Sequence, residues 1–345
     1  MTPDATTRVT TDEYHAGGEP YRIVTGGVPV PEGTTVLDRR AWSAHYLDDA
    51  RAFLVNEPRG HADMYGCFVT PADPDDGRDG AGSFGMVFFH KDGFSTACGH
   101  GTIAGVTWAL DTGLVPAEEP VTEVWVDVPS GRLHTFAEVT GGRVTAVRFE
   151  NVPSYVTATD VAVRAGSRML SVDVSYGGAF YASVDVAQLG ISITPEHLPT
   201  LIEAGRTVKW EIDAHEATTH RVDDRLSGCY GTIWYERLGA DAEGTVHQRN
   251  VTIFADGEVD RSPCGSGTSA RLAVLEHRRE LARGAELVHE SVVGSRFAGR
   301  VLGDGPMIGD YPSVRTEVAG RAHRTGQSVF TFDPDDELGL GFQLR

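Results

Sequence analysis

Hydrophobic and polar residues alternate with a period of two along much of the chain, which is the pattern of half-buried β-strands. Val121–Val128, Arg132–Val139 and Arg143–Glu150 are separated only by short glycine-containing turns, and this spacing predicts an antiparallel meander. The same pattern predicts further strands at Met169–Val174, Phe180–Val184, Tyr230–Tyr235, Val246–Phe254, Glu286–Val293, Arg296–Leu302, Val314–Gly320 and Ser328–Phe332.

Helical spacing of apolar residues is found at fewer places. It predicts a short helix at Leu47–Leu54, a longer one that begins near Pro195, and two more at Thr102–Leu110 and Thr268–Arg279. Strands that are grouped around a few helices favour an α+β fold over a doubly wound parallel sheet. The length of 345 residues suits two domains.

The chain contains an internal repeat. Residues 98–104 read CGHGTIA and residues 264–270 read CGSGTSA, so that Cys, Gly, Gly, Thr and Ala recur at the same offsets, 166 positions apart. Each copy follows a predicted strand and leads into a predicted helix. The repeat therefore predicts a duplicated domain pair in which each half places one cysteine, Cys98 or Cys264, at the start of its central helix.

Two cysteines in such positions suit the inversion of a carbon stereocentre, because one group must remove a proton from one face and another must deliver a proton to the opposite face. The free N–H groups and the dipole at a helix start stabilise a thiolate, which lowers the pKa of a cysteine from its ordinary value of about 8.5. The same N–H groups bind a carboxylate. If the two halves face each other about a pseudo-twofold axis, Cys98 and Cys264 meet across one cleft. The sequence thus predicts a racemase or epimerase.

Other interpretations of the repeat remain open. Both copies fit the loose dinucleotide fingerprint GxGxxA, so an oxidoreductase with a nucleotide cofactor is a distant alternative, although the preceding strands end too early for it. A non-catalytic binding module would not need the thiols. Cys98 and His100 are close together, but no CxxC or HExxH motif completes a zinc site. Neither Lys91 nor Lys209 lies near a phosphate-binding loop, which argues against pyridoxal phosphate. We therefore expect no cofactor and no metal.

The amino-acid composition argues against some classes of binding partner. Asp and Glu number 49 against 30 Lys and Arg, and the formal net charge of −19 disfavours binding to nucleic acid or to an anionic membrane. The N-terminal stretch MTPDATTRVTTDEY lacks the apolar region of a signal peptide, and no apolar run reaches the roughly 18 residues of a membrane span. We therefore expect a cytoplasmic protein with reduced cysteines. Cys67 and Cys229 stand among strand-like residues and are expected to be buried structural thiols.

Five stretches of the chain resemble the proline racemase family, which includes proline racemases, 4-hydroxyproline 2-epimerases and trans-3-hydroxy-L-proline dehydratases. They are HAGGEPYR (15–22), EPRGHADMYG (57–66), ACGHGT (97–102), YGGAFY (176–181) and VDRSPCGSGT (259–268), and the last is the most specific. The resemblance covers essentially the whole chain. It implies a fold like that of diaminopimelate epimerase, with two pseudo-symmetric domains that are each a curled, mostly antiparallel sheet around a central helix. The implied domains are residues 1–152 plus 320–345, which carry Cys98, and residues 153–319, which carry Cys264.

The resemblance also assigns roles to residues. Cys98 and Cys264 would be the two proton-transfer residues, and Asp260 would accept a hydrogen bond from the substrate ammonium. The enzyme would be independent of cofactors, its partner would be a small amino-acid substrate, and a homodimer is the assembly we expect. The substrate carboxylate would be bound, mainly through backbone N–H groups, by Gly99, His100, Gly265 and Ser266.

The sequence departs from the family pattern in ways that bear on the reaction. The dehydratase branch typically has threonine where this chain has Cys264, and retaining this second thiol favours inversion over elimination. In contrast, the segments Gly177–Tyr181 and His61–Gly66 look closer to dehydratases, and racemases and epimerases more often have asparagine in place of Ala179. Both reactions begin with removal of the α-proton. Our hypothesis is inversion of the α-carbon of proline or a hydroxyproline, with dehydration of trans-3-hydroxy-L-proline as the alternative.

Overall fold

The structure is a computed structural model that describes residues 1–75, 77 and 80–344. Contacts divide the chain into two compact units. Unit 1 comprises Met1–Thr96, Gly101–Val147 and the segment from Arg321 onward, and unit 2 comprises Ala97–His100 and Arg148–Gly320. The divisions near residues 148 and 320 lie close to the boundaries implied by the sequence. Cys98, however, is grouped with unit 2 rather than with the N-terminal part of the chain, because its segment lies against Gly265.

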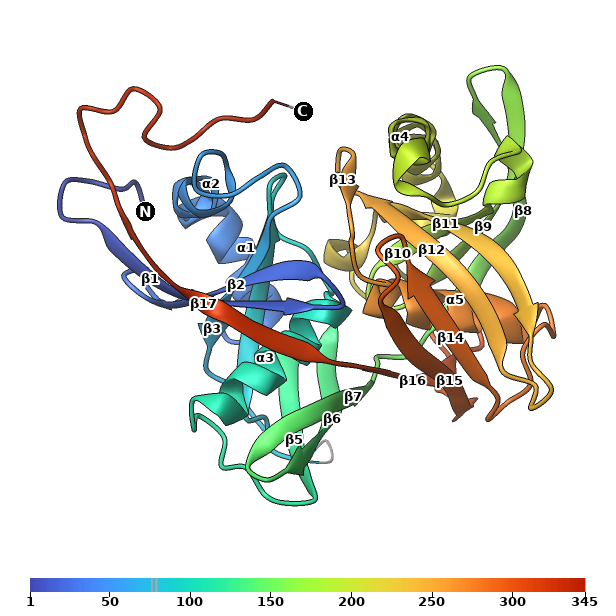
Figure 1. Ribbon diagram of the computed structural model, residues 1–345, viewed down its shortest axis with the longest axis horizontal. Coiled ribbons are helices and arrows are strands. Elements are labelled where there is room, and N and C mark those ends of the chain that lie inside the picture. Colours follow the sequence, from blue (N-terminus) through green and yellow to red (C-terminus); the bar gives the residue numbers. More distant parts are fainter. Residues whose placement is uncertain (76, 78–79, 345) are drawn as a thin grey trace. The chain divides into compact units, whose positions relative to one another are not determined.

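Unit 1 is built on a mixed sheet with the strand order β17–β1–β2–β3–β4–β5–β6. Strand β17 lies beside β1 although the two come from opposite ends of the chain (Figure 1). The elements of this unit are β1 (Arg8–Ala16), β2 (Glu19–Gly26), α1 (Val36–Tyr46), α2 (Asp48–Val55), β3 (Tyr65–Thr70), β4 (Phe84–His90), α3 (Gly99–Asp111, whose first two residues are grouped with unit 2), β5 (Val121–Val128), β6 (Gly131–Thr140) and β17 (Ala322–Thr331).

Unit 2 is built on a mixed sheet with the strand order β8–β9–β10–β11–β12–β14–β15–β16, and the short β13 pairs with the end of β12. Strand β7 (Arg143–Glu150) leads into this unit. The other elements are β8 (Tyr155–Ala165), β9 (Arg168–Tyr176), β10 (Phe180–Asp185), η1 (Val186–Leu189), η2 (Pro195–His197), α4 (Leu198–Asp213), η3 (Glu216–Thr218), η4 (Asp224–Leu226), β11 (Cys229–Ala240), β12 (Val246–Phe254), β13 (Glu258–Val259), α5 (Gly265–His277), β14 (Glu286–Ser291), β15 (Arg296–Asp304) and β16 (Val314–Gly320).

The same series of strand pairings occurs in both units. From β1 to β6 the successive pairs are antiparallel, parallel, antiparallel, parallel and antiparallel, and β9, β10, β11, β12, β14 and β15 repeat this series. Each parallel pair is joined through a helix, because parallel neighbours require a crossover connection. The chain is therefore a structural duplication in which antiparallel pairs predominate, and the predicted α+β fold is confirmed.

The helices α3 and α5 are the central helices of the two repeats. Every residue of α5 from Gly265 to Leu275 is buried, and the helix contacts β8, β9, β10, β15 and β16. Residues 99–110 of α3 are buried in the same way. Both helices start three residues earlier than predicted, at Gly99 and Gly265. Glycine lowers helix propensity, so the apolar pattern alone did not reveal that the first turn includes the Cys-Gly-x-Gly motif.

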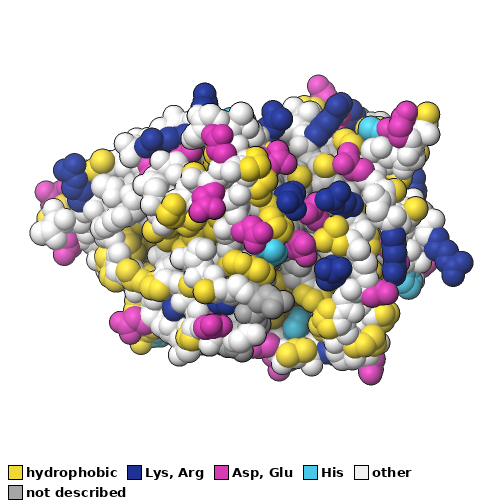
Figure 2. Space-filling view, turned by 90° about the horizontal axis from the view of Figure 1, so that it is seen from below, with side chains coloured by type: hydrophobic (Ala, Val, Ile, Leu, Met, Phe, Trp, Pro, Cys, Tyr) yellow, Lys and Arg dark blue, Asp and Glu magenta, His cyan; other side chains and the backbone are white. Residues whose placement is uncertain are grey.

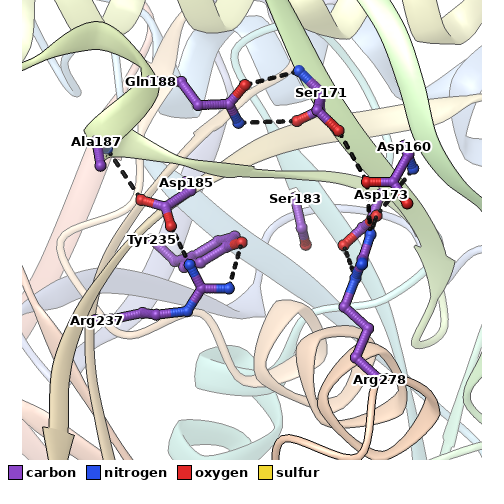
Figure 3. Close-up of a pocket in the computed structure, with 10 residues that line it drawn as sticks. All are labelled: Asp160, Ser171, Asp173, Ser183, Asp185, Ala187, Gln188, Tyr235, Arg237 and Arg278. Atoms are coloured by element: carbon purple, nitrogen blue, oxygen red, sulfur yellow. Dashed lines mark hydrogen bonds and ion pairs between the residues drawn. The ribbon is translucent and has the colours of Figure 1, made fainter.

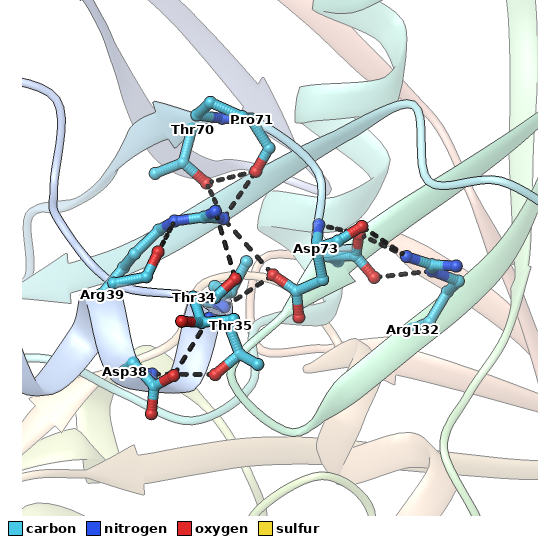
Figure 4. A network of polar contacts seen from close by, with 11 residues as sticks. Thr34, Thr35, Asp38, Arg39, Thr70, Pro71, Asp73 and Arg132 are labelled. Carbon is cyan, nitrogen blue, oxygen red and sulfur yellow. Dashed lines mark hydrogen bonds and ion pairs between the residues drawn. The ribbon is translucent and has the colours of Figure 1, made fainter. Parts of the chain in front are cut away.

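The sequence pattern missed the helix α1, because polar side chains lie on its buried face. Its start is fixed by a capping box, in which Asp38 N donates to Thr35 Oγ1 at 3.2 Å and Thr35 N donates to Asp38 Oδ2 at 3.0 Å. The buried Arg39 donates to Pro71 O at 2.7 Å and forms an ion pair with Asp73 at 3.3 Å (Figure 4). A buried arginine that is neutralised in this way interrupts the apolar periodicity that would have predicted the helix.

A second ion pair extends this polar network of unit 1 into the sheet. Arg132 of β6 donates two hydrogen bonds, of 2.7 and 3.0 Å, to the Asp127 carboxylate of β5, and both side chains are almost completely buried. The carboxylate of Asp127 also accepts from Asp73 N at 2.8 Å. The network thus connects the start of α1, the segment after β3 and the β5–β6 hairpin.

The surface carries charges of both signs. Acidic and basic side chains are interspersed with hydrophobic ones on the face shown in Figure 2, as expected for a chain with 49 acidic and 30 basic residues. Among the helices that the structure describes, none is both long enough and apolar enough to cross a membrane.

Candidate active site

The two Cys-Gly segments of the repeat are in contact through their glycines. A Cβ atom added at Gly265 would lie 2.8 Å from the Cα atom of Gly99, and a Cβ atom added at Gly99 would lie still closer to the Cα atom of Gly265. Real Cβ atoms essentially never approach this closely, so both positions require glycine. The starts of α3 and α5 therefore meet backbone against backbone, and this contact brings together the segments that contain Cys98 and Cys264.

Cys264 is held in an unusual backbone conformation directly before α5. Its φ of 62° and ψ of 94° lie in a region that residues with a side chain rarely adopt. The preceding loop fixes this conformation: Cys264 N donates to Ser262 Oγ at 3.1 Å, Ser262 N donates to Asp260 Oδ1 at 2.8 Å, and Asn250 Nδ2 donates to Pro263 O at 2.9 Å. Strain of this kind is concentrated at functional sites, where the surrounding structure compensates for it.

The Cys264 thiol is buried beside two groups that can exchange protons. Asp260 lies within hydrogen-bonding contact of the thiol, and the Tyr181 hydroxyl is 3.8 Å from Sγ. Burial, together with the charge of Asp260, raises the pKa of Cys264 well above its ordinary value. The sequence-based prediction of a lowered pKa is therefore wrong for Cys264, because the loss of solvation outweighs the helix start.

Asp260 itself is buried and has a perturbed pKa. Burial raises the pKa of its carboxyl group from 3.8 to about 6, although hydrogen bonds from Ser262 oppose the shift. The carboxyl group is therefore close to half protonated in mildly acidic solution. A cation that entered beside it would favour its ionised form.

Cys98 has a different partner. Its Sγ atom lies 3.5 Å from Nδ1 and 3.6 Å from Nε2 of His100, which is also buried. Burial lowers the pKa of His100 to about 3, so the imidazole is neutral near pH 7. A neutral imidazole can accept a hydrogen bond from the thiol, but its low pKa makes it too weak a base to take the thiol proton. The family resemblance implied mainly a backbone role for His100, and the structure adds this side-chain contact.

The residues for which carboxylate binding is predicted lie in the first turns of α3 and α5. The first intrahelical hydrogen bond of α5 is donated by Thr268 N to Cys264 O at 2.7 Å. The N–H groups of Gly265 and Ser266 precede it and so have no partner within the helix. Gly99 and His100 occupy the corresponding first positions of α3. All seven predicted site residues are buried in unit 2: Cys98, Gly99, His100, Asp260, Cys264, Gly265 and Ser266.

Tyr181 is a site residue that the sequence pattern did not reveal. Its hydroxyl lies 2.7 Å from Ser266 Oγ, and its ring packs with Ala97, Ala179 and Ile233 around Cys264. The apolar alternation of β10 made Tyr181 look like an ordinary core residue. Only its position in the YGGAFY stretch marked it.

The remaining cysteines behave as predicted. Cys67 and Cys229 are free and buried, and burial raises the pKa of each to about 12. Among the described residues, no group of three or more His, Cys, Asp or Glu side chains is arranged to hold a metal ion.

These features define an α+β enzyme of two repeats with one cysteine at the start of each central helix. The family model for proline racemase matches residues 12–343. The chain is 41% identical to trans-3-hydroxy-L-proline dehydratase of Bacillus cereus, covering 97% of this chain and 98% of that protein, and 42% identical to 3-hydroxyproline 2-epimerase of Burkholderia multivorans, covering 98% of each.

A solved structure agrees with the sequence comparisons. The crystal structure of a hydroxyproline epimerase from Agrobacterium vitis with bound trans-4-OH-L-proline matches with a TM-score of 0.88 and 31% identity, covering 98% of this chain and 96% of that one. The chain therefore belongs to the proline racemase family. The family membership and the enzyme class expected from the sequence are therefore confirmed. The relatives include proteins named as dehydratases and a protein named as an epimerase, so both of the reactions considered from the sequence occur among the names of the relatives.

The glycine contact gives a testable prediction. Gly99→Ala should destabilise the protein by about 1–3 kcal/mol, because the added methyl group must push the two helix starts apart. Gly326→Ala is the matched control, since no atom lies within 4 Å of a Cβ added there. Thermal melting of both variants measures the difference. Equal melting temperatures for the two variants would contradict the close contact.

Asp260 gives a prediction of pH dependence. The folded-state pKa of about 6 exceeds the ordinary 3.8, so the folded protein holds this proton more tightly than the unfolded chain does. The stabilisation is fully present below about pH 4 and is lost as the pH rises through about 6. Relative to Asp260→Asn, the wild type should thus lose up to about 3 kcal/mol of unfolding free energy between pH 4 and pH 7. Urea unfolding of both proteins across this pH range measures the unfolding free energies. If the wild-type value minus the Asp260→Asn value stays constant or grows as the pH rises, the raised pKa of Asp260 is contradicted.

Proposed function

We propose that this protein is a cofactor-independent epimerase or racemase that inverts the α-carbon of proline or a hydroxyproline, with Cys98 and Cys264 as its two acid–base groups. One observation carries the proposal: two buried cysteines stand at helix starts that touch through Gly99 and Gly265, and each thiol contacts a different polar side chain, His100 for Cys98 and Asp260 for Cys264. Inversion requires two such groups.

The charges of an amino-acid substrate match the groups of this site. Its carboxylate is proposed to bind the N–H groups of Gly99, His100, Gly265 and Ser266, where the two helix starts also favour negative charge. Its ring ammonium is proposed to donate to Asp260 and to favour the ionised carboxylate there. As the α-proton leaves, negative charge spreads onto the substrate carboxylate, so these donors act most strongly in the transition state.

The proton transfers are proposed to run from one thiol to the other. The raised pKa of Cys264 makes it the proton donor of the resting enzyme. Cys98, in the thiolate form that the start of α3 favours, acts as the base: its thiolate takes the α-proton as the C–H bond breaks, and the Cys264 thiol delivers a proton to the opposite face of the same carbon. Cys98 then carries a proton and Cys264 is a thiolate, so the enzyme is ready for the reverse reaction.

Dehydration of trans-3-hydroxy-L-proline is the second candidate, because relatives about 41% identical carry the dehydratase name. It shares the first step. The electron pair of the broken C–H bond then forms a C=C bond, and the β-hydroxyl leaves with a proton as water. One thiol suffices for this reaction, so the retention of Cys264 supports inversion.

The compartment is also part of the proposal. Both thiols must stay reduced to act, and all four cysteines are free. We place the enzyme in the cytoplasm, where the redox poise keeps thiols reduced.

One experiment distinguishes inversion of the α-carbon from dehydration. Purified enzyme without added cofactor is incubated in D2O with proline, trans-4-hydroxy-L-proline or trans-3-hydroxy-L-proline and followed by proton NMR. We expect loss of the α-proton signal together with appearance of the 2-epimer. Loss of the β-hydroxyl with formation of an unsaturated ring would identify a dehydratase instead. Absence of α-proton exchange with every one of these substrates would rule out both reactions.

The two-thiol mechanism is tested by single substitutions. Cys98→Ser and Cys264→Ser should each lower the rate of inversion by at least about 1000-fold, because serine is a far weaker acid and base near pH 7. Cys67→Ala is the control, since this thiol is equally buried but belongs to unit 1 away from the motif. Polarimetry measures the inversion. A Cys264→Ser enzyme that inverts at the wild-type rate would show that the second acid lies elsewhere.

A further inference from the structure

Unit 2 contains a polar cavity at the opposite end of α5 from Cys264. The cavity has a volume of about 430 Å³, and Arg278, which directly follows the last residue of α5, forms part of its wall (Figure 3). A helix of 13 residues is about 20 Å long, so Arg278 lies roughly that far from the start of α5 at Cys264. Its lining residues include no member of the candidate active site.

Opposite charges face each other across this cavity. On one wall Arg278 binds Asp173 with hydrogen bonds of 2.5 and 2.9 Å and also pairs with Asp160 at 3.0 Å. On the other wall Arg237 forms an ion pair with Asp185 (Figure 3). A ligand that carries both a positive and a negative charge can therefore exchange partners with either ion pair without leaving a charge unpaired.

The cavity also contains a polar group that has no partner. Ser183 lies between the two ion-pair walls, its side chain is 2% exposed, and its Oγ atom makes no hydrogen bond (Figure 3). Its strand partners confirm that it faces α5, because it is paired in register with Ile233, which packs against Ala270 of that helix. A buried hydroxyl without a partner is costly, and because Ser183 lines the cavity, a ligand there can supply the missing hydrogen bond.

A buried cation lies beneath the same cavity. Arg271 of α5 is completely buried, its guanidinium stacks 3.5 Å from the ring of Tyr235, and neither of its Nη atoms has a hydrogen-bond partner. Tyr235 forms part of the cavity wall. With Arg237 and Arg278, three guanidinium groups lie near the carboxylates of Asp160, Asp173 and Asp185, and Arg237 also pairs with Glu280 at 3.4 Å, so charges of both signs surround the cavity.

We propose that this cavity is a second binding site, for a small zwitterionic amino acid. The ligand ammonium is accepted by the Asp173 and Asp185 carboxylates, its carboxylate is bound by Arg237 and Arg278, and Ser183 completes the set of hydrogen bonds. The three carboxylates disfavour a polyanion such as a phosphate ester, and the arginines disfavour a simple cation. The proposal does not rest on the reaction that the active site catalyses.

Binding of L-alanine, measured by isothermal titration calorimetry, tests the charge requirement. Propionate and ethylammonium are the matched comparators, because each has the same small skeleton with only one of the two charges. We expect saturable binding of L-alanine with a dissociation constant at or below about 10 mM, and binding of either comparator at least about tenfold weaker. No saturable binding of L-alanine, or equal binding of a comparator, overturns the proposal.

Two variants assign the binding to this cavity. Ser183→Ala should weaken L-alanine binding about fivefold through loss of one hydrogen bond, and Arg237→Gln, at a half-exposed position, about tenfold or more. Ser175→Ala is the control, because Ser175 is another buried serine with an unpartnered hydroxyl, on the neighbouring strand β9 and outside the cavity. It should leave the affinity within twofold. Unchanged affinity in either Ser183→Ala or Arg237→Gln would show that L-alanine binds elsewhere and would overturn the proposal. If Ser183→Ala fails to fold, the Arg237→Gln result decides alone.

Discussion

The approach of Gly99 to Gly265 is the constraint on which the rest of the site depends. Each position excludes even a methyl group, so the two helix starts can meet backbone to backbone. Because of this contact, the starts of α3 and α5, which directly follow Cys98 and Cys264, lie next to each other. The backbone N–H groups of the first residues of both helices are therefore close together. It also explains why four residues of the first repeat, Ala97–His100, are grouped with the second unit.

Burial is the second decisive factor, because it disfavours the charged forms of the site's titratable groups. It raises the pKa of Cys264 and of Asp260 and lowers that of His100. Under the proposed function, a zwitterionic substrate brings the charges that change this balance: its ammonium favours the ionised Asp260, and its carboxylate takes the helix-start donors. Catalysis then needs no permanently charged group at the reacting carbon.

The two ends of α5 differ in the number of charged side chains that surround them. At its start, a single buried carboxyl group and backbone donors surround a thiol, whereas at its end several guanidinium and carboxylate groups are paired around a cavity. The pairing at the far end leaves Ser183 and the buried Arg271 without complete hydrogen bonding. Such incomplete satisfaction within a tightly packed core is the physical basis for assigning a ligand there.

The sequence by itself determined the duplication, the α+β class, the strand-rich pattern and the two Cys-Gly segments, because these are encoded locally by periodicity and by identical residues at equal offsets. It could not determine the protonation of Cys264, since it gives the helix start but not the burial that outweighs it. It also missed Tyr181, a strand residue whose hydroxyl reaches Ser266, and the helix α1, whose buried face holds Arg39. In each case the deciding interaction joins residues that are far apart in the chain, so only the tertiary structure, which sets solvation and long-range partners, could decide it.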